Sequence, residues 1–67
     1  MKISRQKLNL AQARAGVTAT ELCRQSGIPY VTFSQVRRGV REPRPDTLGR
    51  IAKALGVDPA ELLETED

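Results

Sequence analysis

The sequence predicts an all-α domain of five short helices. Glycines separate segments of helix-forming residues, helix-start signals follow several of them, and no alternating strand pattern extends beyond a few residues. The 67 residues suffice for one domain, residues 1–67. A single cysteine and no histidine exclude an internal disulfide and a small zinc finger, so we expect an apolar core without metal.

The first predicted helix covers residues 4–15, which are rich in good helix formers. Leu8, Ala11 and Ala15 recur at helical spacing and form its apolar stripe. Gly16 follows at the position where a left-handed residue commonly ends a helix.

The second predicted helix covers residues 19–26. Thr18 and Glu21 have the spacing of a capping box, in which the hydroxyl accepts from a first-turn amide and the carboxylate bonds back to the Thr18 amide. Leu22 and Cys23 are the inward residues of this helix, and we interpret the cysteine as core packing rather than as a redox switch.

The third predicted helix starts after Pro29, which suits a first helical turn, and it runs to residue 38 before Gly39. Phe33 and Val36 lie one turn apart and are expected to face the core. The opposite face then carries side chains with little charge but several hydrogen-bonding groups: Tyr30, Val31, Ser34 and Gln35.

Two more helices are predicted within residues 45–64. The fourth covers residues 46–55 and has a strong apolar stripe of Leu48, Ile51, Ala52 and Leu55. The fifth begins at Asp58, where an N-cap residue, a proline and an acid three residues on form a start signal. It carries Leu62, expected in the core, and Leu63, expected to be partly exposed.

Charge is distributed unevenly along the chain. Residues 1–44 hold nine basic and two acidic residues, whereas residues 45–67 hold two basic and six acidic ones. The first part suits a polyanion, and the second would face away from it. Catalysis is not expected, because there is no histidine for a nucleophile–base pair and no glycine-rich phosphate loop.

These residues together resemble a known family. The run from Glu21 to Ile28, followed by the helix ending at Gly39, is similar to the helix-turn-helix of the phage repressor and Cro family (XRE type), here residues 18–38. The segment from Pro45 to Leu63 is similar to that family's fourth and fifth helices. The resemblance spans about residues 8–63 and implies a five-helix lambda-repressor-like DNA-binding domain whose third helix enters the DNA major groove.

The resemblance also implies a set of DNA contacts. It assigns base edges to Tyr30, Val31, Ser34 and Gln35, and phosphates to Thr18, Thr32, Arg37, Arg38, Arg41 and Arg44. Gln35 can offer a donor and an acceptor to adenine, and Val31 can contact a thymine methyl group. From the residues alone, alternatives stay open: the Tyr30 ring could pack over Pro29, and the arginines could be solubilising surface charges.

The chain departs from the family pattern at three places. Ala19 stands where many members carry Gln, and Pro29 replaces a Ser or Thr cap. Arg37 stands where an acidic residue is common, and its usual basic partner on the first helix is Gln12. We therefore expect the family's helix-to-helix ion pair to be absent and Arg37 to be free for a phosphate.

These features predict a sequence-specific double-stranded DNA-binding regulator. We expect it to be cytoplasmic, nucleoid-associated when bound to DNA, without cofactor or membrane contact, and to act as a repressor. A homodimer on a palindromic operator is expected, with Leu62 and Leu63 as its interface. The alternative is an antitoxin-type module that neutralises a partner protein.

Overall fold

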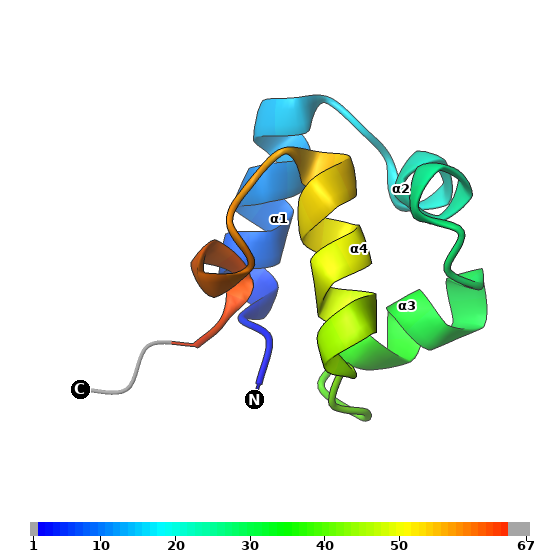
Figure 1. The fold of residues 1–67 in the computed structure, drawn as a ribbon, viewed down its shortest axis with the longest axis vertical. Coiled ribbons are helices and arrows are strands. Elements are labelled where there is room, and N and C mark those ends of the chain that lie inside the picture. Colours follow the sequence, from blue (N-terminus) through cyan, green and yellow to red (C-terminus); the bar gives the residue numbers. More distant parts are fainter. Residues whose placement is uncertain (1, 65–67) are drawn as a thin grey trace.

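The computed structural model describes residues 2–64 and confirms the all-α class (Figure 1). Four α-helices follow one another: α1 (Arg5–Ala15), α2 (Ala19–Ser26), α3 (Tyr30–Arg37) and α4 (Pro45–Leu55). The fifth predicted helix is instead a four-residue 3-10 helix, η1 (Pro59–Leu62). It stays this short because Leu63 has an extended backbone and pairs with another segment.

Side-chain caps open α1 and α2, whereas α3 and α4 begin without one. The Ser4 hydroxyl accepts from the Lys7 amide at 3.2 Å, and the Thr18 hydroxyl accepts from the Glu21 amide at 3.1 Å. The capping box predicted at Thr18 is only half formed, because the Glu21 carboxylate pairs with the Arg24 guanidinium instead. A two-sided capping box opens η1, between Asp58 and Glu61.

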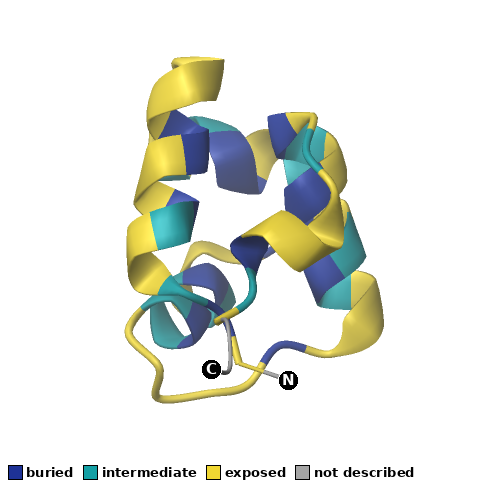
Figure 2. Ribbon diagram, turned by 90° about the vertical axis from the view of Figure 1, so that its left-hand side faces the viewer, coloured by how far each residue is buried: buried dark blue, intermediate teal, exposed yellow. Residues whose placement is uncertain are grey.

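The core lies between the four helices, with α4 packed against α1, α2 and η1 (Figure 2). Its largest fully buried side chains come from every one of these elements: Leu8, Leu22, Phe33, Val36, Ile51 and Leu62. The predicted stripes of α2, α3 and α4 are confirmed. The expectation for Ala15 is wrong, because residues 13–16 are all exposed and the last turn of α1 extends beyond the core.

Both ends of the described chain are joined by backbone pairing. Ile3 and Leu63 form an antiparallel bridge, in which the Ser4 amide donates to the Leu62 carbonyl at 2.7 Å and the Glu64 amide to the Lys2 carbonyl at 2.9 Å. Ile3 is itself a buried core residue. This terminal bridge was not predicted, and it holds η1 against α1.

Candidate nucleic-acid interface

A tight turn connects α2 to α3. Gly27 adopts a left-handed backbone with φ of +75°, and its amide donates to the Cys23 carbonyl at 2.9 Å. Ile28 then enters the core, and the Pro29 carbonyl accepts from the Phe33 amide at 3.0 Å in the first turn of α3. The turn therefore fixes the direction of α3 against α2 through both backbone geometry and burial.

One face of α3 is anchored and the other is open. Phe33 and Val36 are each 1% exposed, which holds the helix on the core. Tyr30 is 56% and Val31 67% exposed, large values for such apolar side chains. The Tyr30 side chain is therefore accessible to a partner. A helix held in this manner presents a continuous surface to a partner.

Ser34 and Gln35 complete this face and are half-buried. The Gln35 carbonyl accepts from the Val40 amide at 3.0 Å and from the Arg41 amide at 3.3 Å. The loop after α3 is thus folded back onto the end of the helix. This fold-back holds Arg41 beside the face that carries the four predicted base-contacting residues.

Three of the predicted phosphate contacts line one surface pocket of about 170 Å³: Thr32, Arg41 and Arg44. Thr47, in the first turn of α4, also lines it and was not predicted as a contact. Its signal was available, because a hydroxyl two residues after Pro45 falls at a helix start. Hydroxyl and guanidinium donors in this lining suit a phosphate oxygen, whereas the carboxylate of Glu42, which lines the same hollow, opposes one.

Arg37 occupies a different position from the one expected. Its Nη2 donates to Oδ1 of Asn9 at 2.9 Å, so α3 is linked to α1 without an ion pair. The Arg37 Nε and the Gln12 Oε1 are buried and have no hydrogen-bond partner within residues 2–64. The Arg37 side chain is therefore already hydrogen-bonded within the protein, and the expectation that it is free for a phosphate does not hold.

The remaining predicted phosphate contacts, Thr18 and Arg38, are exposed. Thr18 caps α2, so its hydroxyl already accepts one bond while its own proton stays available. Arg38 is the C-cap of α3 and lies next to the folded-back loop.

The predicted dimer residues differ in exposure. Leu62 is 0% exposed and belongs to the monomer core, as expected for that side chain, and Leu63 is half-buried. Leu62 therefore offers no surface to a second copy. Two apolar side chains that the sequence analysis did not assign are widely exposed instead, Leu10 at 57% and Val40 at 70%.

Burial raises the pKa of the Cys23 thiol above its ordinary value. Among residues 2–64 no cluster of three or more acidic, cysteine or histidine side chains is placed to hold a metal ion. No helix in that part of the chain has the length and apolar character needed to cross a bilayer.

A short turn between two packed helices, with the second helix open on one face, defines a helix-turn-helix DNA-binding domain. The family model of the Cro/C1-type helix-turn-helix DNA-binding domain matches residues 3–67. The chain belongs to this family.

Two curated relatives from Mycobacterium tuberculosis strains, CDC 1551 / Oshkosh and H37Rv, are named as uncharacterized HTH-type transcriptional regulators. Each is 47% identical over 49 residues, which is 73% of this chain and 34% of the relative. The chain thus spans about a third of the length of these relatives.

Among solved structures, a mutant of hydroxyethylphosphonate dioxygenase superposes with a TM-score of 0.82 at 22% identity. The match covers 100% of this chain and 14% of the dioxygenase. At this identity the similarity concerns the fold alone, so the same helical arrangement is present as a small part of a much larger enzyme.

Proposed function

We propose that this chain is a sequence-specific double-stranded DNA-binding transcriptional regulator that acts as a repressor, as a dimer on a palindromic operator. The observation that carries the proposal is the open face of α3, where Tyr30 and Val31 are exposed beside Ser34 and Gln35. Family membership supports DNA binding, and the names of the two mycobacterial relatives agree with a regulatory role.

One face of α3 would meet the bases while its opposite face anchors the helix on the core. The major groove of B-DNA is about 12 Å wide and admits one helix. Gln35 would donate to and accept from adenine, while Val31 would contact a thymine methyl group. Because Phe33 and Val36 anchor the helix from behind, little conformational freedom would be lost when these side chains meet the bases.

Phosphate contacts would fix the register without selecting a sequence. The pocket lined by Thr32, Arg41 and Arg44 would supply them along one side of α3, and Thr18 would supply one at the start of α2. The concentration of basic residues before residue 45 would add attraction at longer range.

Repression follows from occupancy, because a protein seated in the major groove at a promoter excludes the polymerase. A single helix in one groove gives modest affinity, so two copies on half-sites about 34 Å apart are proposed. We assign no reaction to the chain: the Cys23 thiol is buried, and burial raises its pKa.

Selection of bound duplexes from a random pool tests the proposal directly. We expect an enriched motif with two-fold symmetry, and binding that weakens about a thousandfold between about 50 and 200 mM salt if roughly six phosphates are contacted. Enrichment without any motif would contradict sequence-specific recognition. If no duplex bound at low salt, the protein-interaction alternative would be favoured.

A further inference from the structure

A hollow of about 280 Å³ lies at the surface where α2 packs against α4. We call it the α2–α4 hollow. Its lining comes from the last turn of α2 and from α4: Gln25, Ser26, Arg50, Lys53 and Ala54. None of the residues predicted to contact DNA is among them, and Thr18 lies at the opposite end of α2, roughly 10 Å of helix away. This hollow and the face of α3 can therefore be occupied at the same time.

The hollow carries positive charge that the protein itself does not neutralise. Arg50 and Lys53 are exposed and lie one turn apart on α4. They are the two basic residues of the acid-rich segment 45–67, and both line this hollow. Within residues 2–64 neither cation forms a hydrogen bond or an ion pair, although Asp46 lies one turn before Arg50. Both cations are therefore available to an anionic partner.

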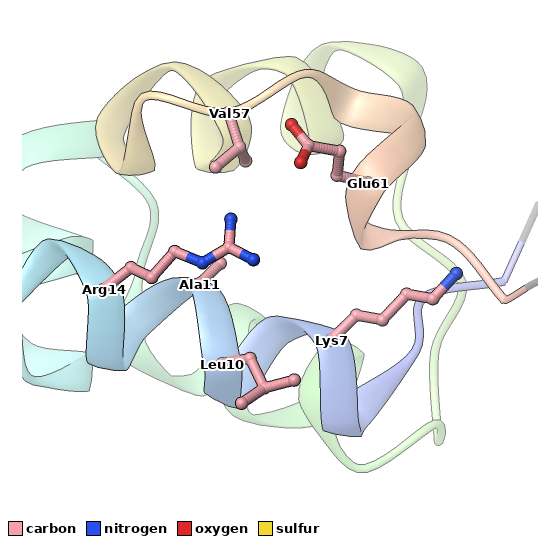
Figure 3. A pocket seen from close by; sticks show the side chains of 6 residues that line it. All are labelled: Lys7, Leu10, Ala11, Arg14, Val57 and Glu61. Carbon is pink, nitrogen blue, oxygen red and sulfur yellow. The ribbon is translucent and has the colours of Figure 1, made fainter.

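Other hollows on the surface differ from this one in charge. Figure 3 shows the hollow of about 270 Å³ between α1 and η1, where the carboxylate of Glu61 reaches in opposite the guanidinium of Arg14. Two further hollows, beside the loop after α3, both include Glu42 in their lining. Each of these three carries a carboxylate that opposes an anion, whereas the lining of the α2–α4 hollow carries cations and neutral side chains.

We propose that the α2–α4 hollow binds an acidic segment of a partner protein. Two carboxylates of that segment pair with Arg50 and Lys53, whose β-carbons lie about 5–6 Å apart at this helical spacing. The exposed Gln25 amide hydrogen-bonds the main chain of the segment, and the half-buried Ala54 methyl group gives a small apolar contact. The inference adds a protein partner to the proposed DNA-binding function and does not depend on it.

The distribution of charge favours a protein segment over a nucleic-acid backbone as the occupant. A phosphate backbone is negative along its whole length. Residues 45–67 hold six acidic residues, including Asp46 on the same helix as the two cations, and these repel a continuous polyanion laid along α4. A protein segment can place two carboxylates at the hollow and neutral residues on either side, so it avoids that repulsion.

Fluorescence anisotropy of the full chain with a labelled peptide that repeats Glu-Ala-Ala-Glu tests the proposal, at low salt because exposed ion pairs are screened. Its glutamates lie one helical turn apart, like the two cations. The wild type is expected to bind this peptide. Combining Arg50→Glu with Lys53→Glu is expected to raise the dissociation constant at least about tenfold, because two attractive pairs become repulsive.

A second double variant controls for net charge. Arg5→Glu combined with Arg14→Glu makes the same change in net charge at two exposed arginines outside the hollow, and it should weaken peptide binding by about twofold or less. Circular dichroism checks that both double variants are folded. If the wild type did not bind the peptide, or if both double variants weakened binding equally, the proposal would be overturned.

Titration with DNA distinguishes a protein segment from a phosphate backbone. The two double variants should bind a random-sequence duplex equally, since they have the same net charge. Greater loss from the hollow variant would make the hollow a phosphate contact, and competition between peptide and duplex would contradict two separate surfaces. Sedimentation equilibrium tests a second copy as the occupant: self-association of the wild type that the hollow variant alone loses would overturn the proposal. If no duplex bound at all, the DNA-binding function would fail while the peptide titration would still decide this inference.

Discussion

Arg37 near the end of α3 donates a hydrogen bond to Asn9 in the middle of α1, with 2.9 Å between Nη2 and Oδ1. The two residues are 28 positions apart in the chain, so the bond fixes the helix that carries the candidate recognition face to the first helix. A neutral amide performs this connection, and no carboxylate takes part in it. Its strength should therefore be almost independent of pH through the range in which carboxylates titrate.

Removing the acceptor should loosen this connection modestly. We expect Asn9→Ala to lower the free energy of unfolding by about 0.5–1.5 kcal/mol, since the bond to the arginine lies at the surface. Urea denaturation measures the change. Asn9→Asp is the control, because it keeps an acceptor and adds a charge opposite the guanidinium. Equal destabilisation by both variants would show that the hydrogen bond to Arg37 does not contribute to the free energy of unfolding at this position.

Base recognition and phosphate binding should separate by mutation. Gln35→Ala is expected to cost about 1–3 kcal/mol on the selected site and little on random duplex, because it removes a contact to a base edge. Arg41→Ala should weaken both duplexes equally and reduce the salt dependence. Fluorescence anisotropy titrations on the two duplexes measure this. If Gln35→Ala weakened both by the same factor, the assignment of the α3 face would be wrong.

Phe33 should dominate the stability of α3. Its side chain is 1% exposed, and Phe33→Ala is expected to cost about 3–5 kcal/mol, a large share of the ~5–15 kcal/mol that a domain possesses. Thermal melting followed by circular dichroism measures the loss. Val31→Ala, at a 67% exposed position on the same helix, should change stability by less than about 0.5 kcal/mol. Similar melting of all three proteins would refute the core position of Phe33.

Two glycines should respond to alanine in opposite directions. Gly27 has a φ of +75°, so Gly27→Ala should destabilise by about 1–2 kcal/mol through left-handed strain alone, since its Cβ would meet no atom within 4 Å. Gly49 lies inside α4 with the same free space, and Gly49→Ala should stabilise by about 0.5–1 kcal/mol. Chemical denaturation of the pair compares them. A gain of stability from Gly27→Ala would contradict the turn geometry.

Cys23 should make the stability depend on alkaline pH. Burial raises the pKa of its thiol, so the unfolded chain releases this proton at a lower pH than the folded one. The stability that the buried neutral thiol contributes is therefore complete below the pKa of the thiol in the unfolded chain. It is lost as the pH rises through the pKa of the thiol in the folded chain. The stability difference between wild type and Cys23→Ala should stay constant at neutral pH and narrow under alkaline conditions. A difference that widened there would contradict the burial.

Local patterns predicted most of the fold because they are encoded by neighbouring residues. The predicted helix ends lie within about a residue of those in the structure, because local signals mark them: the caps at Thr18 and Ser26–Gly27 and the apolar stripe of α4. The pairing of Ile3 with Leu63 has no local signal, since it joins segments at opposite ends of the chain. For the same reason the sequence did not indicate that the fifth helix would shorten to η1.

For the candidate site, the division of α3 into two faces was predictable, whereas contacts between residues distant in the chain were not. Helical spacing separated Phe33 and Val36 from Tyr30 and Val31, and the exposures agree with that division. The partner of Arg37 was not predictable, because Asn9 is an ordinary polar residue on α1 and only the packing of α3 brings the two together. Likewise, the gathering of Thr32, Arg41 and Thr47 depends on a loop that folds back.

The terminal bridge bears on how the domain would carry attachments. Because Lys2 and Glu64 are hydrogen-bonded neighbours, fluorescent proteins attached at these two residues would leave from the same side of the molecule. Tension applied between the two fusion points would break the hydrogen bonds around the Ile3–Leu63 pair one after another, before any helix came under load.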